Sequence, residues 1–334
     1  MRREKLLKTI PLDRLMDLKF DFAFKQLFGI EKNKDITIVF LNAILQRTNR
    51  DKIKDISFKD IEVGGEYEED KQSRLDILAV TNADEWINIE IQFSNQYDIV
   101  KRSLFYWARV YQLPLEKSMP YKKLNPVIAI NILNFDMFDQ TDRFHTTYHL
   151  YEDTEKFKLT DVMEFHFLEM PKLIRDWQAG KLDPWNDILA RWLLMLGMVD
   201  RRKSKVYEDI FKELEAIAMK DEVLREAFTN WEALSGTLEE RLAYEARLKQ
   251  VLDAEAVVAE AELRLKEGIA RGEKQGEIRG EKRGLERGIK KGIEQGEQRQ
   301  KEDTARFLLT QGLDVSLIMG ATGLSKERIQ ELNQ

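Results

Sequence analysis

The sequence predicts an α/β protein in which helices flank a mixed β-sheet, followed by an all-α C-terminal extension. Three observations predict this class. Residues 74–80 and 86–93 are apolar or alternating segments on either side of a short turn, which is typical of a β-hairpin. Residues 126–133 are almost wholly apolar, as in a central strand that is buried on both faces. From residue 171 onward, helical patterns follow one another with no strand pattern between them.

The composition allows a large core and excludes several kinds of site. The chain has 334 residues, of which 43% are hydrophobic and 34% charged, and its net charge is −6. This length suits two domains, or one domain with a helical extension. The negative charge argues against an overall basic surface but leaves room for a local basic groove. The lack of cysteine excludes disulfides, zinc–thiolate sites and cysteine nucleophiles.

The sequence also predicts a cytoplasmic protein with no membrane partner. No apolar run approaches the ~18 residues that a membrane span requires. The basic start of the chain is not followed by the apolar stretch of a signal peptide.

The first helix is predicted by aromatic residues at helical spacing. Phe20, Phe24 and Phe28 recur at every fourth position, and the following glycine is a suitable helix end. Asp21 and Lys25 are one turn apart on this helix and can point the same way. An exposed ion pair and a role in a site both explain that pair. A second helix is expected over residues 36–47.

The predicted hairpin brings two carboxylates together. It follows an edge strand over residues 56–63 and a charged loop over residues 66–72. A turn centred on Ala83 would set Asp76 opposite Glu90, on one face and with Cβ atoms roughly 5 Å apart. Two like charges at that distance repel each other unless a cation bridges them, and oxygen ligands suit Mg²⁺ or Mn²⁺. The alternative is a half-exposed hairpin that carries ordinary surface carboxylates.

A helix over residues 97–113 and two further strands complete the predicted α/β part. Arg102 and Tyr106 are four residues apart and share a face, where a cation and a phenol could orient a phosphate. A solvated helix face explains the same pair. The residues predicted to be buried on this helix are Val100, Leu104, Trp107, Ala108 and Tyr111. Strands over residues 144–151 and 162–168 could set His149 opposite His166, which we interpret as ordinary cross-strand packing.

The C-terminal part is predicted to be helical throughout. Helices are expected at residues 171–179, 185–198, 202–219 and 221–232, followed by a long helix over residues 237–267. A basic cluster at residues 201–205 would lie in an exposed helical turn or touch a phosphate backbone. After the long helix, a glycine occupies every fourth position. These glycines are Gly268, Gly272, Gly276, Gly280, Gly284, Gly288, Gly292 and Gly296.

The glycine repeat predicts a marginal helix. Four residues turn an α-helix by about 400°, so the glycine stripe moves about 40° around the helix at each repeat and cannot form one flat packing face. Each glycine costs about 1 kcal/mol in a helix, against a few tenths for each charge pair. The segment is therefore interpreted as a linker or self-association arm. Residues 304–334 are expected to form short helices. Within them, residues 317–329 are similar to a small helix-turn-helix, which could bind DNA or serve as an oligomerisation tail.

Four short motifs resemble one known family. They are residues 21–29, residues 74–78, residues 88–92, and Arg102 with Tyr106. In their order and spacing they resemble the recombination-promoting nucleases (Rpn), which are also described as transposases of the PD-(D/E)XK nuclease superfamily. The resemblance covers roughly residues 13–235, and the glycine repeat and the C-terminal piece are similar to further features of that family.

The resemblance implies a restriction-endonuclease-like core and Mg²⁺-dependent cleavage of DNA phosphodiesters, with Mn²⁺ as the other candidate metal. By the family pattern, Asp76 and Glu90 would bind the metal together with the backbone carbonyl of Ile91. The catalytic set would be Asp76, Glu90 and Gln92. Gln92 replaces the lysine of the parent Glu-x-Lys pattern, and it can orient water although it has no charge. Because of this replacement, the sequence does not identify the general base.

The resemblance also implies which residues would bind the substrate, and it leads to an expected division of the chain into parts. Substrate-binding residues would be Asp21, Lys25, Arg102 and Tyr106. The expected parts are a nuclease-like core at 13–170, a helical subdomain at 171–235, a long helix with the glycine arm at 237–301, and a helical tail at 302–334. The expected function is a metal-dependent DNA endonuclease linked to recombination or mobile elements. The alternative is a catalytically weak DNA-binding or assembly protein that forms homo-oligomers through its C-terminal arm.

Overall fold

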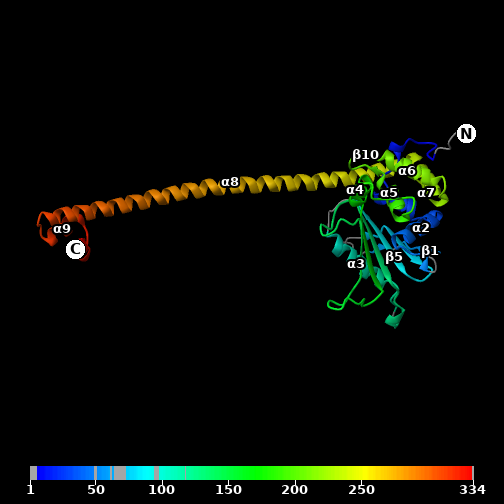
Figure 1. The fold of residues 1–334 in the computed structure, drawn as a ribbon, viewed down its shortest axis with the longest axis horizontal. Helices are drawn as coiled ribbons and strands as arrows, with labels where there is room; N and C mark the ends of the chain where they lie inside the picture. Colours follow the sequence, from blue (N-terminus) through cyan, green and yellow to red (C-terminus); the bar gives the residue numbers. More distant parts are fainter. Residues whose placement is uncertain are drawn as a thin grey trace. The chain divides into compact units, whose positions relative to one another are not determined.

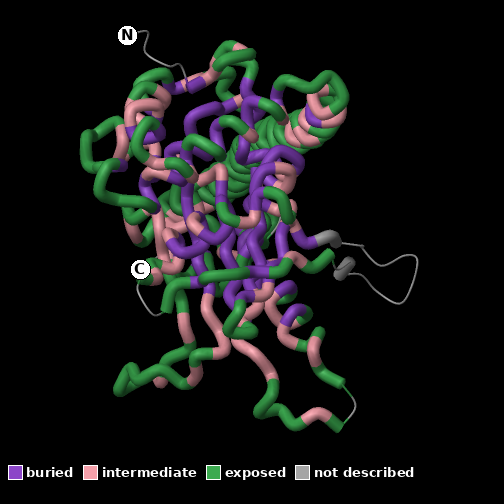
Figure 2. Tube along the Cα trace, turned by 90° about the vertical axis from the view of Figure 1, so that its right-hand side faces the viewer, coloured by how far each residue is buried: buried purple, intermediate pink, exposed green. Residues whose placement is uncertain are grey.

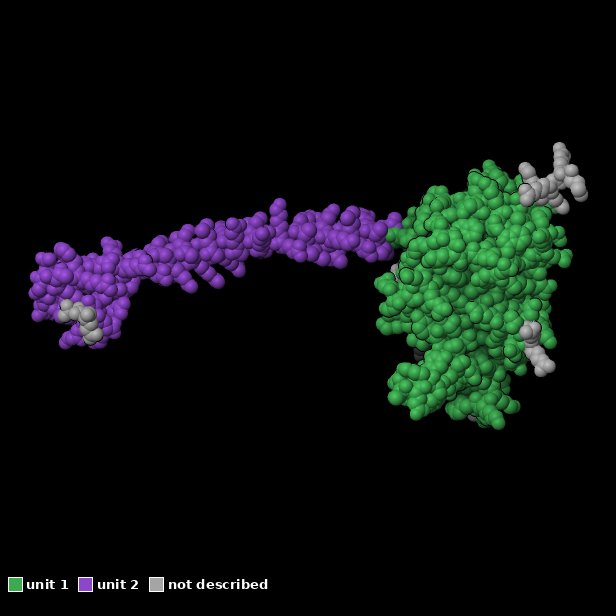
Figure 3. Space-filling view, viewed as in Figure 1, with its two compact units in different colours: residues 1–255 green, residues 256–334 purple. Residues whose placement is uncertain are grey.

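The chain forms two compact units, residues 1–255 and residues 256–334 (Figure 3). The computed structural model describes residues 6–48, 51–60, 62–63, 73–93, 98–116 and 118–332. Helix α8 (Leu238–Thr310) contributes residues to both units. Among the helices in these described ranges, none combines the length and the apolar character that crossing a membrane requires.

Within the described residues, the first unit is built on a six-stranded mixed sheet with the strand order β1-β4-β5-β6-β8-β7. Strands β5, β6 and β8 are parallel, whereas β1, β4 and β7 pair antiparallel with their neighbours. The strands of this sheet are β1 (Ile56–Phe58), β4 (Ile77–Thr81), β5 (Trp86–Gln92), β6 (Val127–Leu133), β7 (His145–Tyr148) and β8 (Met163–Glu169). Strand β6 is buried along its whole length, as its apolar sequence predicts.

Helices cover both faces of this sheet, which confirms the predicted α/β class (Figure 1). Helix α3 (Ile99–Gln112) packs on one face, where Tyr106 and Val110 belong to one hydrophobic cluster with Leu78. Helices α1 (Asp21–Phe28) and α2 (Lys34–Ile44) pack on the other face, against the isoleucines of β5 and β6. Buried residues therefore concentrate along the central strands and the helices beside them (Figure 2).

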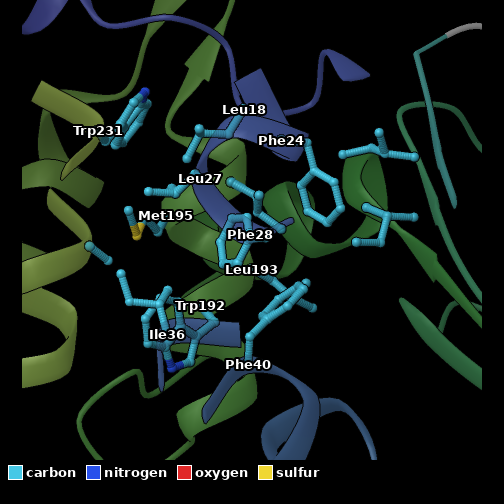
Figure 4. Close-up of a cluster of buried hydrophobic side chains, with 14 of the residues drawn as sticks. Leu18, Phe24, Leu27, Phe28, Ile36, Phe40, Trp192, Leu193, Met195 and Trp231 are labelled. Atoms are coloured by element: carbon cyan, nitrogen blue, oxygen red, sulfur yellow. The ribbon is translucent and has the colours of Figure 1, made fainter. Parts of the chain in front are cut away.

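The largest hydrophobic cluster joins the N-terminal helices to the helical part of the unit. Phe28, Phe40 and Trp192 pack against one another, with ring centroids 4.8 to 6.3 Å apart (Figure 4). The helices after the sheet are α4 (Met170–Gln178), α5 (Ile188–Gly197), α6 (Glu208–Ala218) and α7 (Glu222–Gly236). They lie next to one another at one end of the sheet (Figure 1). A shared core ties residues 171–235 to helices α1 and α2.

Several predicted boundaries were wrong. The strand predicted over residues 56–63 ends at Phe58, and Glu62–Val63 (β2) instead pairs with Ser73–Arg74 (β3) in a separate small sheet. Exposed Lys59 and Asp60 separate the two segments. The charged loop expected at residues 66–72 lies outside the described residues. Residues 201–204 of the basic run form the turn between β9 (Val199–Asp200) and β10 (Lys205–Val206), and helix α6 begins only at Glu208.

The buried face of α3 was also predicted wrongly. Val100 and Leu104 are 39% and 44% exposed, whereas Ile99, Ser103, Tyr106 and Val110 are buried. Asn131 of β6 explains part of this orientation, because its side-chain amide donates to the hydroxyl of Ser103 (2.9 Å). A buried asparagine needs such a polar partner, and the partner selects the helix face that meets the sheet.

The second unit contains the rest of α8, α9 (Val315–Thr322) and α10 (Lys326–Leu332). The predicted long helix and the glycine repeat form one continuous helix. A Cβ atom added at any glycine of the repeat would meet nothing within 4 Å among the described atoms. At the end of the chain, a small cluster of Ala305, Ile318, Leu324 and Ile329 packs the terminal helices together. Short 3₁₀ turns elsewhere are Leu12–Arg14, Glu31–Asn33 and Tyr121–Lys123.

Candidate active site

Strands β4 and β5 pair with the register that the hairpin predicts. Ile77 lies opposite Ile89 and Val80 opposite Trp86, so the same register sets Asp76 opposite Glu90. The N–H of Asp76 donates to Oε1 of Glu90 (3.3 Å). The N–H of Ile91 donates to Oδ2 of Asp76 (2.8 Å). Two carboxyl groups from neighbouring strands therefore converge.

The turn between these strands fixes that register. The N–H of Thr81 donates to the carbonyl of Glu85 (2.9 Å), and the N–H of Asp84 donates to the carbonyl of Thr81 (3.0 Å). Asp84 has a φ of 59°, in the left-handed region that aspartate tolerates better than most residues. The local turn thus determines which residues face each other at the open end of the hairpin.

Burial makes this carboxylate pair hard to ionise. Glu90 is only 2% exposed, and burial, together with the nearby charge of Asp76, raises the pKa of Glu90 to about 8. Burial also raises the pKa of Asp76, while the ammonium group of Lys25 opposes that rise. Around neutral pH, the pair consequently holds a proton when no added cation balances the two charges.

A basic side chain faces each carboxylate. Lys25 of α1 places its Nζ 3.0 Å from Oδ1 of Asp76. Arg102 of α3 places Nη2 3.5 Å from Oε2 of Glu90, and its Nη1 donates to Oε1 of Gln92 (3.2 Å). The Nε of Arg102 is buried and has no acceptor among the described residues.

Asp21 and Tyr106 occupy different positions relative to this pair. Asp21 begins α1 and lines the same cleft as Lys25 and Asp76, and its charge contributes to the raised pKa of Asp76. Tyr106 is 3% exposed and packs under Arg102, whose guanidinium carbon lies 5.2 Å from the ring centroid. Tyr106 therefore supports Arg102 and is not among the residues that line the cleft.

The site opens into a cleft of about 740 Å³. Its charged lining residues include Asp21, Lys25, Lys59, Asp76, Arg102 and Arg247. Sequence reasoning missed Lys59 and Arg247. Lys59 belonged to a strand predicted to be longer than it is, and Arg247 lies far along the chain in a helix interpreted as an arm. No local pattern links either residue to Asp76.

A comparison with models of protein families found one description that fits the chain, PD-(D/E)XK nuclease family transposase, over residues 18–261. The match spans more than two-thirds of the chain and includes Asp76 and Glu90. The chain belongs to the PD-(D/E)XK nuclease family transposases. Comparisons with curated proteins and with solved structures returned no match.

The region matched to the PD-(D/E)XK nuclease family transposases extends past the expected limit of residue 235. It ends at residue 261, and therefore includes the beginning of α8. In this chain that beginning carries Arg247, which lines the cleft. The start of α8 is consequently part of the nuclease-family region.

A histidine cluster lies on the opposite face of the sheet from Glu90. The strand register sets Thr147 opposite His166, so the predicted pairing of His149 with His166 was wrong. His166 instead lies 2.8 Å from His145 and 2.7 Å from Glu164. Burial, followed by the charge on His166, lowers the pKa of His145 to about 4. Among the described residues, no group of three or more histidine, aspartate or glutamate side chains is arranged to hold a metal.

A second cavity of similar size shares no lining residue with the cleft that contains Asp76. It measures about 780 Å³ and lies between α2, the start of β7 and the start of α5. None of the predicted site residues lines it. The cleft that contains Asp76 is therefore the candidate active site.

Proposed function

We propose that this chain is a metal-dependent DNA endonuclease that hydrolyses phosphodiester bonds in recombination or in the movement of mobile elements. The observation that carries the proposal is the buried pair of Asp76 and Glu90, held together from neighbouring strands. Burying two like charges side by side costs stability. Such an arrangement is typical of a site that functions with a cation between the two groups.

The donor set around the pair fits a hard divalent cation such as Mg²⁺ or Mn²⁺. Asp76 and Glu90 offer carboxylate oxygens. The N–H of Ile91 points to Asp76, and the N–H and C=O of one strand residue point to the same side, so the Ile91 carbonyl is directed there as well. Three oxygen donors then face one region, with the rest of the coordination left to water and substrate. A bound metal would balance the charge of the transition state and lower the pKa of an attacking water.

The remaining side chains have roles on the substrate. Lys25 and Arg102 supply the positive charge that Gln92 lacks, and both can contact the scissile phosphate. The buried Nε of Arg102 has no acceptor in the described part of the chain, so the guanidinium group is not fully hydrogen-bonded. The Gln92 side chain lies within 3.5 Å of Glu90 and can orient water.

A plasmid-nicking assay tests the proposal. The wild-type protein is expected to nick supercoiled DNA with Mg²⁺ or Mn²⁺ and to stop when EDTA is added. Asp76→Ala and Glu90→Gln should each reduce the rate by at least about a hundredfold, because each removes an anionic ligand. Asp60→Asn is the matched control, since Asp60 lines the same cleft without contacting Asp76. Full activity of the Asp76→Ala protein would refute the assignment.

One set of observations favours a second function, a catalytically weak DNA-binding and assembly protein. Gln92 has no charge, and Lys25 and Arg102 already form ion pairs with the carboxylates. The glycines of α8 have no packing partner among the described residues, which leaves them available to another copy of the chain. Titration calorimetry that detects DNA binding but no Mg²⁺ or Mn²⁺ binding would support this function. Light scattering that reports a monomer for the full chain would contradict its assembly part.

A further inference from the structure

We propose that the start of α8, residues 238–255, contributes Arg247 to the DNA-binding cleft. Within it, Arg247 acts together with Lys59 to bind phosphates that flank the scissile one. This inference depends on the proposed function for the identity of the substrate. It adds two substrate-binding residues that sequence motifs do not reveal, and it gives this helical segment a direct role in binding.

Position is the first argument. Arg247 and Lys59 line the same cleft as Asp76 and Arg102, although they come from α8 and from the end of β1. DNA that lies across Asp76 presents a phosphate about every 3.4 Å of helix axis on each strand, so further phosphates lie beyond the carboxylate pair. Cations elsewhere on the lining of the cleft are placed to meet those neighbouring phosphates.

Charge is the second argument. Lys25 and Arg102 are engaged by the site carboxylates. Within the described ranges, by contrast, Lys59 and Arg247 form no ion pair, and the guanidinium of Arg247 instead lies 4.9 Å from the ring centroid of Phe22. An arginine held on an aromatic face keeps its N–H donors for another ligand, and guanidinium groups suit phosphate oxygens.

The rigidity of the α8 start is the third argument. Tyr244 is 4% exposed, its hydroxyl accepts a hydrogen bond from the N–H of Asp17 (3.1 Å), and its ring packs edge-on against Phe20 at 5.5 Å. Arg247 follows Tyr244 by about one helical turn and so projects from nearly the same side of α8. The anchor that buries Tyr244 therefore also sets the position of Arg247 over Phe22, which is itself 7% exposed.

The acidic lining explains why the cleft needs these cations. Asp21 and Asp60 line it alongside Asp76, and the charges of Asp21 and Asp60 would repel a phosphate backbone. With Lys25 and Arg102 engaged at the carboxylate pair, attraction along the rest of the cleft falls to Lys59 and Arg247. A protein with a net charge of −6 can still bind DNA when its cations are concentrated in this way.

The test measures binding of a short fluorescent duplex by anisotropy, with EDTA present so that cleavage does not interfere. Arg247→Ala should weaken binding about fivefold and reduce the slope of log K against log salt by about one, as expected for one lost phosphate contact. Lys59→Ala should have a similar effect. Arg247→Lys should retain most of the salt slope because it keeps the charge.

Lys249→Ala is the matched control. Lys249 is an exposed cation on the same helix that does not line the cleft, so its removal should leave affinity and slope unchanged. Equal binding by the Arg247→Ala and Lys249→Ala proteins would overturn the inference, as would a wild-type protein that does not bind the duplex. Binding that depends on Arg247 without any plasmid nicking would contradict only the proposed nuclease activity. Thermal melts of each variant check that the fold is retained.

Discussion

The proton held by Glu90 is the most informative single feature at the scale of residues. Its pKa rises from the ordinary value of 4.5 to about 8 because the side chain is buried next to Asp76. Between these two pH values the folded chain keeps a proton that the unfolded chain releases. Folding stability of the metal-free protein should therefore fall as pH rises through this window.

Replacing this carboxyl group by an amide tests the argument. Glu90→Gln resembles the protonated form and has nothing to release, so the variant should lose less stability between pH 5 and pH 8. The wild-type slope from this residue is at most about 1.4 kcal/mol per pH unit. Urea denaturation at several pH values in EDTA measures both proteins, with Asp60→Asn as an exposed control from the same cleft. Parallel pH profiles for wild type and Glu90→Gln would show that the buried carboxyl group does not hold this proton.

At the scale of elements, sequence reasoning succeeded where neighbours along the chain decide the structure. The register of β4 and β5 follows from one turn and one alternating strand, so the meeting of Asp76 and Glu90 was predictable. The buried strand β6 was equally predictable because all of its residues except Asn131 are apolar.

Elements whose position depends on distant contacts were not predictable in this way. The buried face of α3 depends on Asn131 of another strand, and the histidine pair depends on the register between β7 and β8. Arg247 reaches the cleft because Tyr244 is anchored near Asp17, a contact that links opposite ends of the first unit's sequence. Local patterns contain no information about such pairs, and so only some of the cations that line the cleft were predicted.

Helix α8 gives a test at the same scale. An alanine methyl group at Gly284 would meet no atom within 4 Å in the described structure, so Gly284→Ala should stabilise the helix by about 0.8–1 kcal/mol. Far-UV circular dichroism during thermal unfolding measures the gain, and Ala261→Gly, at another exposed position of α8, should produce a comparable loss. Weaker self-association of the Gly284→Ala protein in light scattering would instead show that the glycine lies against another chain, as the assembly hypothesis requires.

At the scale of the whole molecule, the start of α8 belongs to the first unit. Tyr244 is part of the main hydrophobic cluster, and Leu248 and Val251 pack against it. A chain that ends at residue 255 should therefore fold with the stability of the first unit. A chain that ends at residue 236 loses a buried aromatic residue and should be destabilised by at least about 3 kcal/mol.

Tryptophan fluorescence during urea unfolding can compare the two truncated chains, because Trp192 and Trp231 are fully buried in the first unit. The chain ending at residue 255 serves as the reference, since it retains Tyr244 and Arg247. Equal unfolding midpoints for the two chains would mean that the start of α8 contributes nothing to the core, and the anchoring of Arg247 would then lose its basis.

The turn between β4 and β5 limits which insertions and deletions the chain can accept without separating Asp76 from Glu90. Side chains of a strand point alternately to opposite faces, so a one-residue change in register moves every side chain of that strand to the other face. Adding or removing a single amino acid within residues 81–85 would thus separate Asp76 from Glu90 while leaving both in the sequence. The length of this loop therefore decides whether a related chain keeps the two carboxyl groups together. A sequence comparison that considers the carboxylates alone would not detect the difference.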